Sequence, residues 1–304
     1  MSLETDLLID RRRLKRRLSG WRIATVLAVA ACALAVLGPH LRYAGGTHLA
    51  RLSVTGLITD NRELTEAVTA LAKDAAVRGL IVFVDSPGGS VAGGESLHDA
   101  ITRVAAGKPV VAVMGGTAAS AGYMVSLPAS RIFARESTLT GSIGVLLQTG
   151  EASGLLSRIG ITAEAFVSGP LKDQPSFTQP TSPRGREVLQ ALVMDMYDQF
   201  VGMVATGRHM TPERVRELAD GRAYTGRQAL TLGLVDAIGG EAEARAWLAA
   251  EKGIPESLPV EDVRPAGLGL RTLAGSISPI LGSVMKSLLP QGLMLDGAWA
   301  IWQP

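Results

Sequence analysis

Two uninterrupted apolar runs, each followed by a glycine-rich stretch, constrain the fold more than any other feature of this sequence. They cover 79–85 and 109–114. Continuous apolar runs of this length are typical of strands buried on both faces, as in parallel sheets. A helix predicted at about 91–106 joins them, and strand–helix–strand units favour parallel pairing. We therefore predict an α/β fold in which helices cover a parallel sheet.

Further elements continue this pattern along one domain, which we place at 51–253 without internal repeats. The apolar periodicity predicts strands at 52–58, 131–134, 142–147 and 161–167 and helices at 62–77, 152–159, 185–206 and from Thr211 onward. The 47% apolar and 19% charged composition suffices for a core and excludes disorder of the bulk.

The N-terminus carries the basic character of the chain, whose net charge is +2. Residues 1–22 hold seven bases and three acids, and the remainder is slightly acidic, which disfavours a nucleic-acid-binding surface. The next nineteen residues, 23–41, have no charged side chain, and as a helix they would span ~28 Å. The flanking bases predict a membrane anchor with 1–22 in the cytoplasm and the rest translocated. A cleaved signal peptide, a buried core helix and lipidation at Cys32 are the alternatives.

A linker at 42–50 and a tail at 254–304 flank the predicted domain. The tail has an apolar stripe at helical spacing, which predicts an amphipathic helix formed by Ile277, Ile280, Leu281, Val284, Met285, Leu288 and Leu289. This helix would pack on the domain, on a partner subunit or on the membrane surface.

Cysteine and histidine usage limits the chemistry. The single cysteine excludes an internal disulfide framework, and the four scattered histidines have no metal-ligand spacing. We expect no metal and no cofactor. Aromatic residues make up only 4% of the chain, too few for stacking on nucleic-acid bases.

Three segments carry residues suited to catalysis. Gly88 and Gly89 follow the first buried strand, where backbone N–H groups can face an oxyanion, although a plain turn would look the same. Ser120 follows the second buried strand among small residues and is either a nucleophile or a helix N-cap. Lys172 lies in a loop, where an exposed lysine is the ordinary interpretation.

The choice of lysine at position 172 is informative. The chain has six lysines against twenty-four arginines, so arginine is its usual base. A buried ammonium group can lose its proton and act as a general base, whereas a guanidinium cannot. A serine activated by a neutral lysine is a known catalytic arrangement.

Five motifs together resemble signal peptide peptidase A (SppA) in its short form. They are Ser-Pro-Gly-Gly at 86–89, Ala-Ala-Ser-x-Gly-Tyr at 118–123, Leu-Thr-Gly-Ser-Ile-Gly-Val at 139–145, Ser-Gly-x-x-Lys-Asp at 168–173, and Asp-Gly-Arg-x-Tyr-Thr-Gly at 220–226 with Gly-Leu-Val-Asp at 233–236. The resemblance covers about residues 50–250 in the family's motif order and spacing.

The resemblance implies a role for each matching residue. It makes Ser120 the nucleophile, Lys172 the general base and Ser142 the hydroxyl that hydrogen-bonds the lysine. The N–H groups of Gly89 and Ala121 would form the oxyanion hole; the family often has glycine at the latter position. It also implies a Clp-protease/crotonase-like fold, a ring-shaped homo-oligomer, and a Lys172 that reaches Ser120 of a neighbouring subunit.

The expected function is therefore a membrane-anchored serine endopeptidase of the bacterial inner membrane, with its catalytic domain on the extracytoplasmic side. Apolar peptides such as remnant signal peptides, or misfolded exported proteins, are the expected substrates. The alternatives are a membrane-tethered regulatory protease of the stomatin-operon type, a crotonase-like acyl-CoA enzyme and a non-catalytic membrane scaffold. A Clp-type Ser-His-Asp triad is disfavoured because no histidine occurs between Ser120 and His209.

Overall fold

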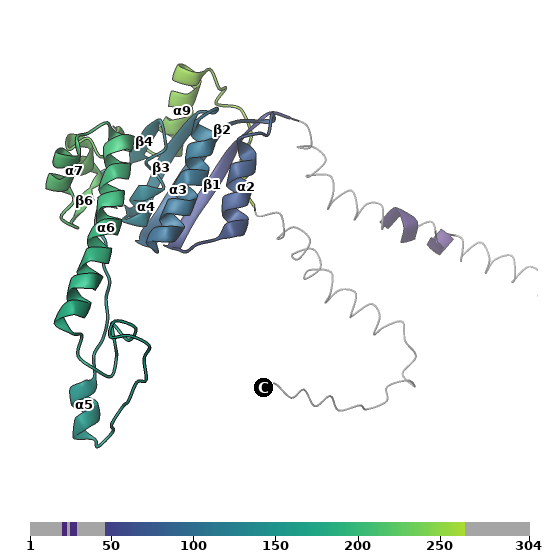
Figure 1. The fold of residues 1–304 in the computed structure, drawn as a ribbon. Helices are drawn as coiled ribbons and strands as arrows, with labels where there is room; N and C mark the ends of the chain where they lie inside the picture. Colours follow the sequence, from purple (N-terminus) through teal and green to yellow (C-terminus); the bar gives the residue numbers. More distant parts are fainter. Residues whose placement is uncertain (1–19, 23–24, 29–45, 265–304) are drawn as a thin grey trace, which may run out of the picture. The chain divides into compact units, whose positions relative to one another are not determined.

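The computed structural model describes residues 20–22, 25–28 and 46–264 (Figure 1). The chain forms two units, Met1–Thr47 and His48–Pro304. In the first, 20–22 and 25–28 are helical, and the Thr25 hydroxyl donates to the Trp21 carbonyl. Most of the predicted anchor and the predicted tail helix lie outside the described residues. Among the residues described, no helix combines the length and apolarity needed to cross a bilayer.

The second unit contains an eight-stranded mixed sheet, which confirms the predicted α/β class. Its strands are β1 (His48–Ile58), β2 (Val77–Gly89), β3 (Val110–Ala119), β4 (Arg131–Ala134), β5 (Leu139–Gly141), β6 (Ala223–Thr225), β7 (Ala237–Ile238) and β8 (Val260–Asp262). Their main order is β6-β5-β3-β2-β1-β8, with β4 paired to β3 and β7 paired to β4. Every pair is parallel except β5–β6.

Helices cover both faces of this sheet. The helices of this unit are α2 (Arg62–Leu71), α3 (Val91–Ala105), α4 (Ala121–Met124), α5 (Ser153–Arg158), α6 (Pro183–Arg208), α7 (Pro212–Leu218), α8 (Gly226–Thr231) and α9 (Glu241–Lys252), of which α5 lies away from the sheet. In Figure 1, α2 and α3 lie side by side across one face, whereas α9 lies on the other side of the sheet.

The central strand β2 shows why the first apolar run is continuous. Leu80 and Val82 are fully buried in the larger core, which includes residues of α3 and α6. Ile81, between them, is fully buried in a second core, with Leu248 of α9. Successive strand residues point to opposite faces, so both faces of β2 require apolar side chains. Each such burial contributes about 1.5–3 kcal/mol.

Several predicted boundaries differ from the structure. The prediction of a strand at 142–147 is wrong, because β5 lies just before it, at 139–141, and 142–147 is irregular. Residues 161–167 form no strand either, since no neighbouring strand is there to pair with them. The sheet also reaches past the predicted domain limits. β1 begins at His48, and β8, in the predicted tail, pairs with β1 from Leu49 to Arg51.

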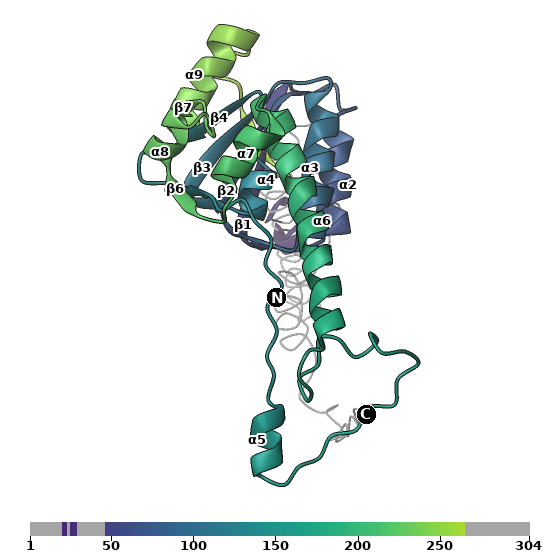
Figure 2. The same ribbon diagram turned by 60° about the vertical axis from the view of Figure 1, so that its left-hand side comes forward.

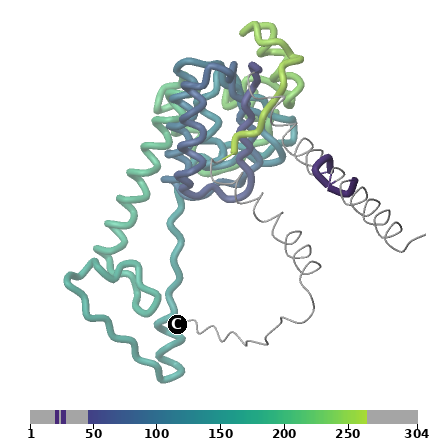
Figure 3. The backbone as a smooth tube through the Cα atoms, turned by 90° about the vertical axis from the view of Figure 1, so that its right-hand side faces the viewer, coloured from purple at the N-terminus to yellow at the C-terminus, as the bar shows by residue number. Residues whose placement is uncertain are grey.

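A long projection, which we call the arm (residues 145–199), leaves the sheet after β5 and returns along α6. The Ser182 side chain caps α6 by accepting from Gly185 N–H, and Pro183 occupies its first turn. Phe200, Val201 and Val204 bury the last turns of this helix in the larger core, where α6 contacts α4 and α7. Figures 2 and 3 show that its first turns, α5 and the connecting loops extend beyond the sheet.

Candidate active site

The carboxyl ends of β2, β3 and β5 bring three of the sequence motifs together. The strands are parallel neighbours, with Ser86 paired to Ala118 and Ala119 paired to Gly141. Parallel strands end at the same edge of a sheet, where ligands commonly bind in open α/β folds. The glycine turn, Ser120 and Ser142 therefore lie at one edge. The positions of the first two after buried strands predicted this, whereas Ser142 was predicted to begin a strand and follows β5 instead.

Ser120 occupies a strained turn between β3 and α4. Its φ of 54° lies in the left-handed region, which is costly for a residue with a side chain. Its backbone is held on both sides, because Ser120 N–H donates to Gly141 O at 2.9 Å and Ser120 O accepts from Tyr123 N–H at 2.9 Å. The side chain makes no capping hydrogen bond and is partly exposed. The hydroxyl is thus free for chemistry, in a strand-to-helix turn like those that present serine nucleophiles.

The glycine turn packs directly against this serine. Gly88 has a φ of +118°, and a Cβ placed on it would lie 2.8 Å from Ser120 Cβ and 3.3 Å from Ala121 N. A Cβ on Gly89 would lie 1.9 Å from Ile58 O. Both positions therefore need glycine, and the close approach brings the segment that contains Gly89 beside Ser120 and Ala121.

Ser142 directly follows β5, just as Ser120 directly follows β3. Each serine follows one member of the Ala119–Gly141 pair, and Ser142 also has a positive φ, 48°. Its N–H donates to Arg222 O at 2.9 Å, and its side chain is partly buried. The structure thus brings Ser142 to the same edge as the nucleophile candidate.

Lys172 is the one predicted site residue that a single chain does not bring there. It lies in the arm, is exposed, and its backbone N–H donates to Gly169 O at 3.0 Å. Within the described residues, no hydrogen bond or ion pair joins it to Ser120 or Ser142. Figures 1 and 2 agree that the loops between α5 and α6 lie at the end of the arm away from the sheet.

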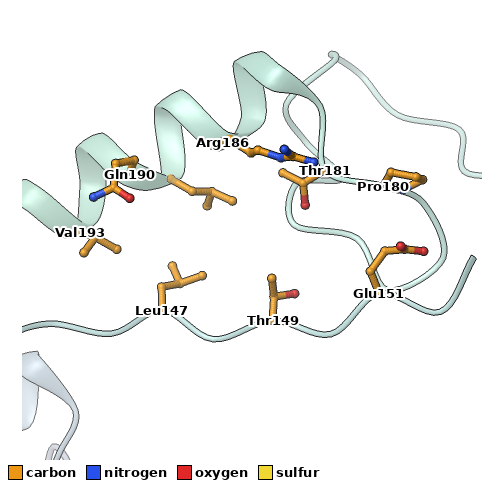
Figure 4. A pocket seen from close by; sticks show the side chains of 9 residues that line it. Leu147, Thr149, Glu151, Pro180, Thr181, Arg186, Gln190 and Val193 are labelled. Carbon is orange, nitrogen blue, oxygen red and sulfur yellow. The ribbon is translucent and has the colours of Figure 1, made fainter.

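The arm has a groove of its own, shown in Figure 4. The groove has a volume of about 450 Å³ and lies between residues 147–151 and the first turns of α6. Apolar side chains such as Leu147, Leu189 and Val193 line one part, and Glu151 and Arg186 lie at the other. Neither Ser120 nor Lys172 lines this groove.

Two of the motifs hold the structure rather than the reacting groups. The Asp236 carboxylate accepts two hydrogen bonds from Arg208, at 2.6 and 3.0 Å, and one from Ile132 N–H at 2.8 Å. Tyr224 donates to Leu218 O at 2.9 Å, and a Cβ on Gly141 would meet its ring at 2.7 Å. These contacts position α6 and β5, which in turn support the serine-bearing edge.

The part of the chain that the structure describes contains no cluster of three or more metal-ligating side chains. His98 and His209 line a separate cavity beside α3 and α6, not the serine-bearing edge. Ser86 is the residue near the turn whose role no sequence pattern indicated, because buried and exposed serines look alike in a sequence; its contacts are described below.

A model of peptidase family S49 matches residues 102–255. This chain is 36% identical over 234 residues to a Synechocystis sp. protein provisionally named a protease. The match covers 76% of this chain and 84% of that protein. An Enterococcus faecium protein provisionally named signal peptide peptidase SppA is 37% identical over 233 residues, covering 72% and 67%. Protease 4 of Salmonella typhi is 36% identical over 225 residues, which are 73% of this chain but 36% of Protease 4. Among solved structures, a ClpP1 mutant from Listeria monocytogenes is similar over 62% of this chain and 91% of its own, with 20% identity and a TM-score of 0.42.

Proposed function

Because this chain belongs to peptidase family S49, we propose that it is a membrane-anchored serine endopeptidase with a Ser120–Lys172 dyad. The observation that carries the proposal is the strained Ser120 turn, in which the backbone is fixed and the hydroxyl has no capping role. Membership in a peptidase family favours peptide hydrolysis over the acyl-CoA chemistry and the non-catalytic scaffold.

The neutral amine of Lys172 takes the Ser120 proton, and the resulting alkoxide attacks the carbonyl carbon of a peptide bond. The N–H groups of Gly89 and Ala121 stabilise the oxyanion that forms. Lys172 then gives the proton to the departing amine, and water hydrolyses the acyl-enzyme. Ser142, at the end of the neighbouring strand, accepts or donates a hydrogen bond that orients the lysine.

A second copy of the chain supplies Lys172 in this proposal. The arm exposes apolar side chains of a size that proteins normally cover, including Phe166, Ile159 and Leu155. Packing of arms between subunits would bury these side chains and carry each lysine to the Ser120 edge of a neighbour. Repeated around a closed ring, the same contact would complete every site.

The uncharged stretch 23–41, preceded by basic residues, supports a single membrane span with the peptidase domain outside the cytoplasm. The span would hold the domain close to the membrane surface, where apolar peptides such as cleaved signal peptides are released. We assign such peptides as substrates.

An activated-phosphonate probe tests the assignment, using the full chain in detergent. We expect the probe to label Ser120 and Ser120→Ala to lose labelling by at least ~10³-fold, since the serine is the group that the probe modifies. Ser126→Ala is the matched control, because Ser126 is also a serine near α4 but is fully buried and donates to Gly122 O. Labelling of Ser120→Ala at the wild-type rate would refute the assignment.

Location and substrate need separate measurements. Protease added to intact spheroplasts should digest residues after 42 and leave 1–22 protected; the reverse pattern would contradict the predicted orientation.

Peptides trapped on the Lys172→Ala variant, identified by mass spectrometry, should be apolar. Recovery of predominantly charged, soluble peptides would contradict the substrate class.

A further inference from the structure

Ser86 is a fully buried polar residue next to the glycine turn, near the end of β2. Burial of a hydroxyl is unfavourable unless its hydrogen bonds are satisfied. Its hydroxyl lies 2.6 Å from Gly56 O, to which it donates, and it accepts from Gly88 N–H at 3.1 Å. One proton and the free lone pairs of a hydroxyl allow both bonds at once.

Both partners of Ser86 are backbone groups in irregular conformations. The pairing of β1 with β2 shifts between Thr55 and Leu57, so that Gly56, with a φ of +69°, stands opposite two residues of β2, Ser86 and Pro87. Gly88, with a φ of +118°, starts the turn that packs on Ser120. The Ser86 hydroxyl therefore links the irregular step in the β1–β2 pairing to the turn.

The backbone of Ser86 also contacts the nucleophile's helix. A Cβ on Gly122 would lie 2.9 Å from Ser86 O, so α4 passes directly over this residue. Ser86 thus lies between the two backbone segments that contain the proposed oxyanion donors, Gly89 and Ala121. The Ser86 hydroxyl also lies 3.3 Å from Gly88 O, a second acceptor for its proton. Gly88 O and Gly89 N–H belong to the same planar peptide group, so contacts of Ser86 with both Gly88 N–H and Gly88 O restrict where Gly89 N–H points.

We propose that Ser86 is a positioning residue for oxyanion stabilisation: its hydroxyl holds the Gly88 peptide so that Gly89 N–H is directed at the reacting carbonyl oxygen. This proposal rests on the proposed function. Without the hydroxyl, the turn keeps its glycines but loses the bond that sets its orientation. A donor displaced by a fraction of an ångström stabilises the transition state less, and misplacements of ~1 Å can cost ~10²-fold in rate.

A pair of substrates separates this role from general destabilisation. The full chain in detergent is assayed with a peptide ester and with the thionoester of the same peptide, in which sulfur replaces the carbonyl oxygen. Sulfur is a poor hydrogen-bond acceptor, so the thionoester gains little from the oxyanion hole. Ser86→Ala should lower kcat for the oxygen ester by ~10–100-fold, leave KM within ~2-fold, and change the thionoester rate much less.

Ser126→Ala is again the matched control, because it also removes a fully buried serine hydroxyl near α4 but one that bonds Gly122 O. It should leave the ratio of oxygen-ester to thionoester rates at the wild-type value. Ser86→Cys, which keeps the side-chain shape with a weaker hydrogen-bonding group, serves if Ser86→Ala does not fold and should also lower the ratio.

An unchanged ratio in the folded Ser86 variants, with equal losses for both substrates, would overturn the positioning role. The proposed function is tested separately in the same assay. If Ser120→Ala still hydrolyses the oxygen ester, the dyad assignment fails. If Ser120→Ala is inactive and the Ser86 ratio is unchanged, only the role of Ser86 fails.

Discussion

The sheet edge and the arm are two halves of one proposed active site, and a single chain completes only the first. At the sheet edge, parallel strands bring Ser120, Ser142 and the glycine turn together through backbone contacts within the chain. The arm contains eleven of the eighteen large apolar side chains that are exposed among the described residues. The comparison teaches that the fold of one chain is enough to position Ser120, whereas Lys172, the proposed base, lies apart from it in the arm.

The two regions also differ in how their ends are held. Near the sheet, Arg208 at the end of α6 is largely buried and forms a two-bond ion pair with Asp236. In the first turn of the same helix, the Arg184–Glu187 pair is solvent-exposed. Exposed pairs contribute about 0–1 kcal/mol, whereas breaking a buried pair costs about 3–5 kcal/mol. One helix therefore has a fixed end and an end available for another surface.

Mixing two inactive variants tests most directly whether Ser120 and Lys172 of one active site come from different chains. Ser120→Ala keeps the arm lysine, and Lys172→Ala keeps the sheet-edge serine, and each alone should lose at least ~10³-fold in kcat. If the lysine comes from a neighbouring subunit, chains mixed in equal amounts before assembly should regain about a quarter of wild-type activity, since a quarter of random neighbour pairs are complete. Activity is measured after co-refolding or co-expression.

The control for mixing is Ser120→Ala combined with the double variant Ser120→Ala/Lys172→Ala, which should remain inactive. Absence of recovery, in mixtures shown by mass spectrometry to contain both chains in one assembly, would place the dyad within one chain.

Two phenylalanines, one in the core and one on the arm, should differ in their effects on unfolding and on assembly. Phe200 is 1% exposed, and Phe166 is 96% exposed on the arm. Phe200→Ala should lower the free energy of unfolding by about 3–5 kcal/mol because it leaves a cavity. Phe166→Ala should change the unfolding of the isolated chain by less than about 0.5 kcal/mol but weaken assembly. Denaturant titration and sedimentation measure the two effects; an unchanged assembly constant for Phe166→Ala would exclude this side chain from the subunit contact.

Gly88→Ala tests whether the close packing of the glycine turn on Ser120 is needed for the reactivity of that serine. The added Cβ would lie 2.8 Å from Ser120 Cβ on a backbone with a φ of +118°. We expect about 1–3 kcal/mol of destabilisation and a phosphonate labelling rate at least ~10-fold lower. Gly107→Ala is the control, because nothing lies within 4 Å of a Cβ there. Equal labelling rates for the two variants would show that the turn can move without consequence for Ser120.

The sequence predicts the sheet edge far better than the arm, for physical reasons. Buried strands such as β2 and β3 require continuous apolar residues, and close backbone approach at Gly88 requires glycine, so both leave a clear pattern. The apolar residues at 161–167 also predicted a strand, although Thr162 and Glu164 interrupt them, and no strand is there to pair with them. An apolar pattern indicates that a segment will be buried, but it does not indicate which other segment will pack against it.

Short and tertiary features leave no local signal. β8 has three residues, too few for a periodic pattern, and it joins the sheet through pairing with β1, which is more than two hundred residues away. The sequence does not distinguish Ser86 from an ordinary serine in a turn, because its hydrogen bonds to Gly56 and Gly88 depend on the fold. The base at position 172 was indicated by residue choice and motif spacing, while its contact with Ser120 remains a prediction that one chain does not test.

The smallest expected effect concerns β8, a three-residue strand that pairs only with β1 among the described residues. Arg51 Nε donates to Asp262 Oδ1 at 2.8 Å and, as the main cause, holds the pKa of Asp262 below its usual value. A depressed folded-state pKa means that the stabilisation is present above the unfolded value of about 3.9 and is lost as pH falls through the folded value. Because the pair is partly exposed, Asp262→Asn should cost only about 0.2–1 kcal/mol at pH 7, and the difference from wild type should vanish at the acid end. Asp60→Asn, an exposed aspartate without an ion pair among the described residues, should show no such difference. A cost for Asp262→Asn that grows as pH falls would mean that something other than the ion pair holds β8 on the sheet.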